Sequence, residues 1–153
     1  MYDIEKLNQH SEDVKEYIES NNENAPQFMN HYNVYKLDPE VVTRLKCHSI
    51  RYTIYAFSAE WCPDCHKHIP VLARIQEETG LKTRILGHLM REVKSSTKRW
   101  RVPPSPAEVE EFNLVRIPSM YILDKKGNKV GEIIEHPPAG MTLEAAVLKI
   151  LES

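Results

Sequence analysis

The sequence predicts an α/β fold in which a mixed β-sheet is flanked by helices and preceded by an N-terminal helical extension. Residues 50–57 (IRYTIYAF) are β-branched and aromatic, as is typical of a strand. Residues 63–78 then place apolar side chains at helical spacing, and Gly80 is a common helix stop. Residues 119–123 and 129–134 flank the turn sequence DKKGN and predict a hairpin. Helical and tight connections together indicate parallel and antiparallel strand pairs.

Length and composition fit one soluble globular unit. The chain has 153 residues, 41% of them hydrophobic and 27% charged, which is enough to bury a core without a metal or disulfide staple. Lys plus Arg number 20 and Asp plus Glu 22, so the net charge is −2. This balance gives no reason to expect a nucleic acid or a membrane as partner. Three cysteines are too few for a disulfide framework.

The expected location is the cytoplasm, where thiols stay reduced. The N-terminus, MYDIEKLNQH, lacks a basic region followed by an apolar run, so it does not resemble a secretory signal. No apolar stretch approaches the roughly 20 residues that a membrane-spanning helix needs.

Two segments are expected, a helical extension over residues 1–47 that packs on a domain formed by residues 48–153. Apolar residues at helical spacing predict one helix from about Ile4 to Ile18, and its acidic residues, such as Glu12 and Asp13, are interpreted as a solvated face. Asp38 before Pro39 predicts the start of a second helix.

The remaining elements alternate between strand and helix. Residues 81–89 predict a strand, and the basic residues 91–104 predict a solvated, irregular loop. The sequence SPAE at 105–108 is a capping box, which predicts a helix that continues to about residue 113. Thr142 is expected to cap a terminal helix.

The chemistry is concentrated in Trp61-Cys62-Pro63-Asp64-Cys65, at the turn from strand to helix. Cys62 is expected at the helix N-terminus, where unpaired N–H groups and the helix dipole favour a thiolate. That effect lowers the pKa of a cysteine below its free value of about 8.5 and activates it as a nucleophile. Cys65 lies one turn along, close enough to form a disulfide with Cys62.

These residues resemble the active site of the thioredoxin superfamily, and the resemblance spans about residues 48–152. It extends beyond the two cysteines to other positions of the family pattern. These positions are Phe57, Ala59, Glu60 and Trp61 before the first cysteine, Pro70 in the following helix, Val115-Arg116-Ile117-Pro118-Ser119 as the family's cis-proline loop, and Gly127 in the hairpin.

The resemblance implies a role for each matching residue. Cys62 would be the attacking, solvent-facing thiol and Cys65 the more buried, resolving thiol. Pro118 would adopt a cis bond and, because it has no N–H, leave the neighbouring backbone open to pair with an extended substrate segment. Trp61 would supply an apolar rim. The residues expected to contact substrate are Trp61, Pro63, Asp64, Ile117 and Pro118.

Two positions depart from the family pattern. Ala56 stands where thioredoxins usually have a buried aspartate that helps to move the proton of the second cysteine. Glu60, water or a histidine is then expected to substitute, or the deprotonation of Cys65 is slower. Pro63-Asp64 replaces the usual Gly-Pro, and the Asp64 charge would oppose ionisation of Cys62 if it points at the sulfur.

The sequence thus predicts a thiol–disulfide oxidoreductase, a disulfide reductase that needs no cofactor beyond its own thiols. Its partners would be a disulfide-containing protein substrate and an external reductant. One alternative is a zinc or other metal module that uses Cys62, Cys65 and the nearby His66 and His68. Another is a non-catalytic interaction module with the same fold. In the catalytic interpretation, both histidines are expected on the exposed helix face, and Cys47 is expected to be a buried or half-buried small apolar side chain.

Overall fold

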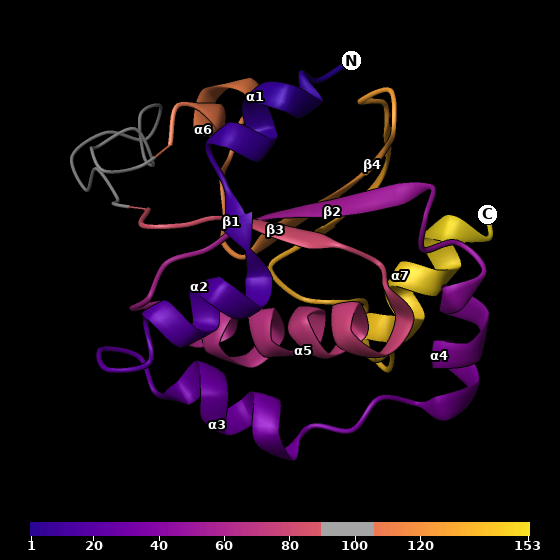
Figure 1. Ribbon diagram of the computed structural model, residues 1–153, viewed down its shortest axis with the longest axis horizontal. Coiled ribbons are helices and arrows are strands. Elements are labelled where there is room, and N and C mark those ends of the chain that lie inside the picture. The colour runs from indigo at the N-terminus through magenta and orange to yellow at the C-terminus, as the bar shows by residue number, and fades with distance from the viewer. Residues whose placement is uncertain (90–105) are drawn as a thin grey trace.

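The computed structural model describes residues 1–89 and 106–153, which form a five-stranded sheet with helices on both faces (Figure 1). The strand order is β1-β3-β2-β4-β5. The strands are β1 (Glu12–Asp13), β2 (Tyr52–Phe57), β3 (Thr83–Leu86), β4 (Ser119–Asp124) and β5 (Lys129–Ile134). β2 pairs with β3 in parallel and with β4 antiparallel, and the β4–β5 hairpin is also antiparallel. The predicted mixed sheet is therefore confirmed.

Seven helices surround this sheet in the described part of the chain. They are α1 (Ile4–Gln9), α2 (Val14–Ser20), α3 (Gln27–Val34), α4 (Pro39–Lys46), α5 (Pro63–Thr79), α6 (Glu108–Glu111) and α7 (Leu143–Leu151). In Figure 1, α5 and α2 lie beneath the sheet with α3 below them, while α1 and α6 lie on the opposite side. α5 packs against α2, α3, α4 and α7, so it is the central helix of the fold.

β2 occupies the middle of the sheet, and its C-terminal end leads to the two cysteines. Ile54, Tyr55, Ala56 and Phe57 are buried because neighbouring strands and covering helices enclose them on all sides. The strand begins at Tyr52, two residues later than predicted, because Ile50 stands exposed in the preceding turn.

The N-terminal segment differs from the single helix that its periodicity predicts. α1 ends at Gln9, and Glu12 and Asp13 form β1, which pairs antiparallel with β3. The carboxylate of Asp13 accepts hydrogen bonds from the N–H groups of Lys15 and Glu16, so it caps a new helix. The acidic residues at 12 and 13 are therefore sheet and cap residues rather than a solvated helix face.

Most of the predicted helix ends agree with the structure. The side chains of Asp38 and Thr142 cap α4 and α7, and Gly80 ends α5 with a left-handed φ of 81°. α6 is shorter than predicted and has no side-chain cap, since it spans only Glu108–Glu111. The capping residue proposed for it, Ser105, and the basic loop at 91–104 lie outside the described residues.

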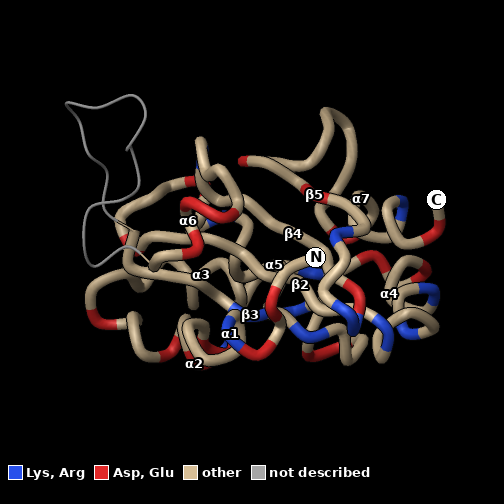
Figure 2. The backbone as a smooth tube through the Cα atoms, turned by 90° about the horizontal axis from the view of Figure 1, so that it is seen from above, with Lys and Arg blue, Asp and Glu red and all other residues tan. Residues whose placement is uncertain are grey.

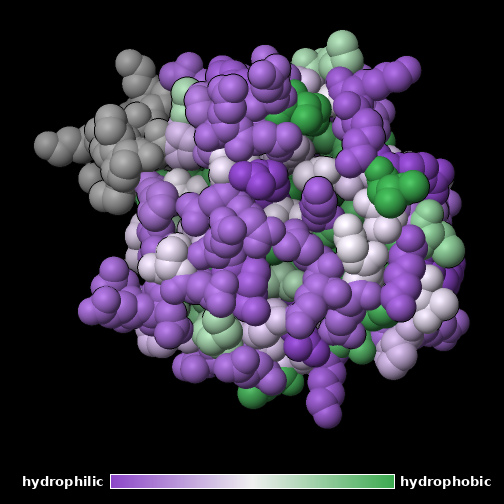
Figure 3. Space-filling view, viewed as in Figure 1, coloured by the Kyte–Doolittle hydropathy of each residue, from purple (hydrophilic) through white to green (hydrophobic). Residues whose placement is uncertain are grey.

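Asp and Glu are spread over the described chain, whereas Lys and Arg lie mainly on the side that carries α4 and the two termini (Figure 2). The face seen in Figure 3 is mostly hydrophilic and carries small separate apolar spots. Within the described ranges, none of the helices has the length and apolar character needed to cross a membrane.

Candidate active site

Cys62 is the N-cap of α5, and its sulfur is held against the first turn of that helix. Its backbone is extended, with φ −88° and ψ 116°, and Pro63 occupies the first helical turn. The N–H of Cys65 donates to Cys62 Sγ at 3.3 Å. Both cysteines are free thiols, with Cys65 fully buried and Cys62 only 5% exposed. Cys62 is therefore more buried than the solvent-facing position that the family resemblance implies.

The two thiols differ in their tendency to ionise. A hydrogen bond from the Cys65 side chain, with help from the N–H groups of Cys65 and Asp64, lowers the pKa of Cys62 below its usual value. Burial raises the pKa of Cys65 well above its usual value, and the neighbouring Cys62 raises it further. Cys62 is thus the more readily ionised thiol of the pair, and Cys65 is the one that holds its proton more strongly.

A rim of backbone and aromatic groups surrounds the Cys62 sulfur. The Cys62 thiol donates to the carbonyl of Ile117 at 3.8 Å, and the Ile117–Pro118 peptide bond is cis. Glu135 donates its N–H to the Pro118 carbonyl at 2.6 Å, so the end of β5 fixes this loop. Trp61 is 50% exposed, and its indole N–H donates to the Leu89 carbonyl at 3.1 Å.

The residues predicted to contact substrate are thus close to one sulfur, although they differ in exposure. Pro63 and Asp64 are exposed on the first turn of α5, whereas Ile117 and Pro118 are buried, and the Ile117 carbonyl faces Cys62. The charge of Asp64 acts to raise the pKa of Cys62, as the sequence suggested. The hydrogen bonds at the sulfur outweigh that effect, since the net shift is downward.

The surroundings of Cys65 differ from those proposed from the sequence. Ala56 is fully buried and brings no titratable group. Glu60 pairs with His88 at 2.6 Å, while hydrogen bonding from the Ala59 backbone and the Ser58 side chain acts to lower the pKa of Cys65. Ser58 is the functional candidate that the sequence reasoning missed, because an isolated serine after a strand carries no motif.

The positions of His66 and His68 differ from those that a metal site with Cys62 and Cys65 would need. The His66 ring hydrogen-bonds the Glu60 carbonyl at 2.5 Å. His68 is buried, against the prediction of an exposed face, since α3 and the loop after β5 cover that side of α5. In the described ranges, no three His, Cys, Asp or Glu side chains are grouped as metal ligands.

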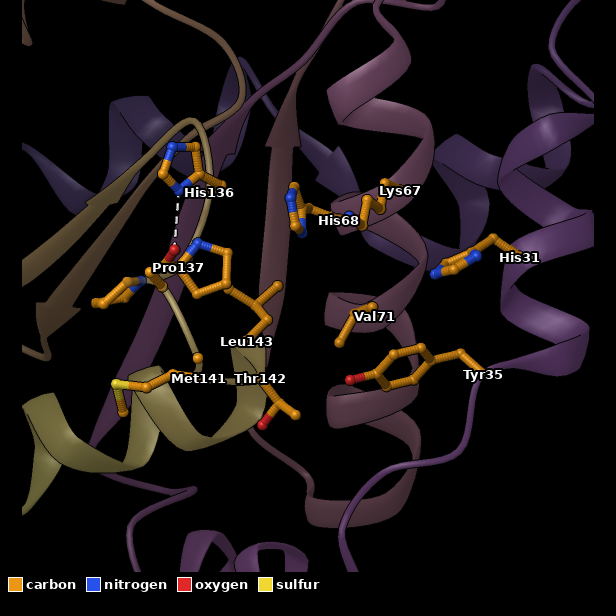
Figure 4. Close-up of a pocket in the computed structure, with 13 residues that line it drawn as sticks. His31, Tyr35, Lys67, His68, Val71, His136, Pro137, Met141, Thr142 and Leu143 are labelled. Carbon is orange, nitrogen blue, oxygen red and sulfur yellow. Dashed lines mark hydrogen bonds between the residues drawn. The ribbon is translucent and has the colours of Figure 1, made fainter.

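His68 contributes to a cavity of about 360 Å³ beside α5 (Figure 4). The walls come from α3, α5 and the loop after β5, and they present the side chains of His31, Lys67, His68 and His136 together with Tyr35. Burial lowers the pKa of His68 to about 4, so the ring is neutral at physiological pH.

Cys47 also departs from its prediction, because it is exposed at the C-terminal end of α4. Its position after the last helical turn, rather than on the apolar side of α4, accounts for the difference. Cys47 thus lies outside the dithiol site and provides an internal control for its chemistry.

A mixed sheet whose central strand delivers two cysteines to the start of one long helix, opposite a cis-proline, is the architecture of a thioredoxin-like protein. A family model described as thioredoxin matches residues 11–103. Because this match covers more than half of the sequence, the chain belongs to the thioredoxin family. No curated protein matches the sequence significantly.

Two solved structures share this fold over nearly the whole chain. A protein of unknown function from Pseudomonas aeruginosa is 20% identical with a TM-score of 0.68, and the match covers 99% of this chain and 98% of that chain. An HIV epitope scaffold is 20% identical with a TM-score of 0.69 at the same coverage of both chains. A reduced thioredoxin pre-protein of Schistosoma mansoni is 16% identical with a TM-score of 0.44, over 77% of this chain and 92% of that chain.

Proposed function

We propose that this protein is a thiol–disulfide oxidoreductase that reduces protein disulfides through Cys62 and Cys65. The observation that carries the proposal is the hydrogen bond from Cys65 N–H to Cys62 Sγ, 3.3 Å long, at the N-terminus of α5. This contact stabilises the Cys62 thiolate and places the second thiol one helical turn away. The two thiols are sufficient to carry two electrons, so no further cofactor is required.

The reaction proceeds in two exchanges. The Cys62 thiolate attacks one sulfur of the substrate disulfide, which forms a Cys62–substrate disulfide and releases the other substrate sulfur as a thiolate that takes a proton from water. Cys65 then loses its proton and attacks the Cys62 sulfur. The intramolecular disulfide forms, the bond to substrate breaks, and the second substrate thiol is released. An external dithiol reductant returns two electrons to the Cys62–Cys65 disulfide.

The substrate would approach between Trp61 and the cis-proline loop. Cys62 is only 5% exposed, so an attacking geometry requires a substrate segment that fits against this rim. Trp61 offers an apolar surface, and the backbone around Ile117 and Pro118 offers polar groups to an extended chain. We propose a protein disulfide as the substrate, and the cytoplasm as the compartment in which a reductant keeps the pair reduced.

The first experiment measures the reduction of a protein disulfide by the wild type and by Cys62→Ser, with dithiothreitol as the final reductant. Cys62→Ser is expected to abolish the reaction above the uncatalysed rate. Cys47→Ser is the matched control, because it removes an exposed thiol outside the site. Equal rates for wild type and Cys62→Ser would exclude the proposal.

A second variant tests the separate role of Cys65. Cys65→Ser retains the nucleophile but cannot resolve the mixed disulfide, so it is expected to accumulate a covalent complex with substrate that dithiothreitol releases. Mass spectrometry of the trapped complex should place the bond at Cys62. A Cys65→Ser chain that turns over as fast as wild type would contradict the resolving role.

The two alternatives make different predictions. A metal module would contain stoichiometric metal after anaerobic purification, and chelation would unfold it. An interaction module would keep its full biological activity in both serine variants, since neither substitution alters the exposed rim. The oxidoreductase proposal predicts the opposite result in each case.

A further inference from the structure

A buried line of polar groups connects the Cys65 sulfur to the N-terminal segment. Ser58 follows β2 directly and is fully buried, as is Cys65. A hydrogen bond from the Ser58 side chain acts to lower the pKa of Cys65, against the effect of burial. On the other side of Ser58, its Oγ lies 3.0 Å from the hydroxyl oxygen of Tyr17, a residue of α2. The Tyr17 ring is also fully buried, so no water competes for these contacts.

The packing holds Tyr17 in one place. The ring makes an edge contact with Phe28, with the two centroids 5.4 Å apart. Gly87, just after β3, passes so close that an added Cβ would lie 2.5 Å from Cε1 of Tyr17. The absence of a side chain at Gly87 therefore lets the Tyr17 ring pack directly against the backbone there.

The direction of the hydrogen bonds follows from the number of protons. Ser58 has a single hydroxyl proton, so it cannot donate to Tyr17 and to Cys65 at the same time. Burial, together with the negative charges of Glu60 and Glu12, raises the pKa of Tyr17 above its usual value. The phenol therefore keeps its proton while a thiol ionises. Tyr17 can always donate to Ser58, which leaves the Ser58 proton for sulfur.

We propose that Tyr17 and Ser58 are positioning residues for the resolving step, in which they stabilise the Cys65 thiolate through two successive hydrogen bonds. This inference rests on the proposed function. Cys65 gives up its proton, its sulfur bonds to Cys62, the Cys62–substrate bond breaks, and the departing substrate thiolate takes up that proton. Neither Tyr17 nor Ser58 accepts the proton. They provide donors to a buried anion that water cannot reach.

The neighbouring charged groups stay the same in every variant described below. Glu60 pairs with His88 at 2.6 Å, and His88 lies 3.8 Å from Glu12 on β1. Asp64 acts on Cys62 from the first turn of α5. A change in the titration of Cys65 on removal of one hydroxyl is therefore assigned to the lost hydrogen bond.

The first test follows the Cys65 thiol directly in a Cys62→Ser background. The ¹³C signal of Cys65 Cβ reports its ionisation across a pH series, separately from that of Cys47. Ser58→Ala is expected to reduce the ratio of thiolate to thiol about tenfold at a given pH, since a hydrogen bond to a charged group is lost. Tyr17→Phe keeps the ring and should reduce it about threefold, because it acts only through Ser58. The double variant should resemble Ser58→Ala alone.

Tyr55→Phe is the matched control for a lost buried hydroxyl. Tyr55 lies on β2, and its hydroxyl donates to Asn8 at 2.7 Å rather than toward the cysteines. The titration of Cys65 in Tyr55→Phe should equal that in the Cys62→Ser chain without a further substitution. If Tyr17→Phe titrates like Tyr55→Phe while both remain folded by circular dichroism, the inference is wrong. Additive effects of Tyr17→Phe and Ser58→Ala would also overturn it.

The second test measures the resolving step in chains that retain both cysteines. A mixed disulfide formed with a model peptide disulfide is followed to release of the peptide thiol in a single turnover. Tyr17→Phe and Ser58→Ala should slow the release and move its pH profile to higher pH, with unchanged formation of the mixed disulfide. Unchanged release would overturn this inference alone. Failure of the wild type to form any mixed disulfide would overturn the proposed function, and the inference with it.

Discussion

At the scale of single residues, the reactivity of Cys62 reflects a balance between hydrogen bonds and one opposing charge. The donors at the start of α5 lower the pKa of Cys62, while the Asp64 carboxylate acts in the opposite direction. Asp64→Asn removes the charge and keeps the backbone N–H that helps to bind the sulfur. The thiolate is the reactive form, so a lower pKa moves the onset of reactivity to lower pH.

We expect Asp64→Asn to increase the alkylation rate of Cys62 by iodoacetamide about threefold at pH values below its pKa, as for one screened charge near the surface. Glu40→Gln is the control, since Glu40 also follows a proline in the first turn of a helix, α4. Peptide mass spectrometry separates Cys62 from Cys47. A rate equal to wild type, or a pH profile moved upward, would contradict the account.

His68 couples the stability of the protein to pH. Burial lowers its folded pKa to about 4 from an ordinary value of 6.5. The contribution of His68 to the unfolding free energy is therefore fully present above pH 6.5. It is lost as the pH falls towards about 4, because the unfolded state then binds a proton at His68 that the folded state does not bind. His68→Gln should reduce the loss of unfolding free energy between pH 7 and 4.5 by about 2 kcal/mol, allowing for water in the adjoining cavity. Urea titrations at both pH values provide the measurement, and an unchanged difference would contradict it.

At the scale of elements, the sequence predicted features that depend on neighbouring residues, such as helix caps. It missed features that depend on packing between distant segments. The cap by Cys62 and the nearness of Cys65 follow from positions three residues apart on one helix. Asp38, Gly80 and Thr142 likewise act within their own turns. In contrast, α1 and α2 are separated by a strand because β3 offers an edge to Glu12 and Asp13. No periodicity within the segment reveals that edge.

Gly87 illustrates a contact between elements that has a measurable consequence. Its Cα faces the Tyr17 ring so closely that Gly87→Ala forces ring or backbone to move. We expect a loss of about 1–3 kcal/mol in unfolding free energy, typical of overpacking. In Gly131→Ala, the closest atoms are side-chain ends of Ile150, which can rotate, so the loss should be smaller. Chemical denaturation checks the order, and the reverse order would contradict this packing.

At the scale of the whole molecule, the N-terminal segment is joined to α5 and α7 through partly buried polar contacts. Glu144 of α7 is 1% exposed and accepts hydrogen bonds from the Tyr35 hydroxyl at 2.8 Å and from the Asp38 N–H at 3.0 Å. Gln76 of α5 donates to Asp13 at 2.7 Å. The division into residues 1–47 and 48–153 remains a prediction, and these contacts argue that both parts unfold together.

Hydrogen exchange provides the test of that cooperativity. Amides in α2 and α3 are expected to exchange with the same opening free energy as those in β2 and α5, within about 1 kcal/mol. If the amides of the N-terminal helices exchanged with a much lower opening free energy while the sheet stayed protected, these helices would form a separate unit. The Tyr17–Ser58 contact would then be intermittent.

Some residues of the candidate site are far apart in the sequence, and this explains why the sequence identified only part of the site. Tyr17 and Ser58 are 41 positions apart and share no motif, so only the packing of α2 beneath β2 and β3 brings their hydroxyls together. Cys62, Cys65 and Pro118 were found because a family pattern marks them. The sequence showed that Ala56 provides no titratable group beside Cys65. It did not show that Ser58 acts on Cys65 instead.

The central claim is that Cys62 and Cys65 exchange two electrons as one unit. The most direct measurement equilibrates the wild type over a series of glutathione ratios, traps the free thiols by acid and alkylation, and maps the modified peptides. The account predicts one two-electron transition in which Cys62 and Cys65 lose their thiols together in a mutual disulfide, independently of Cys47. Separate modification of the two cysteines at every potential, with no disulfide between them, would contradict it.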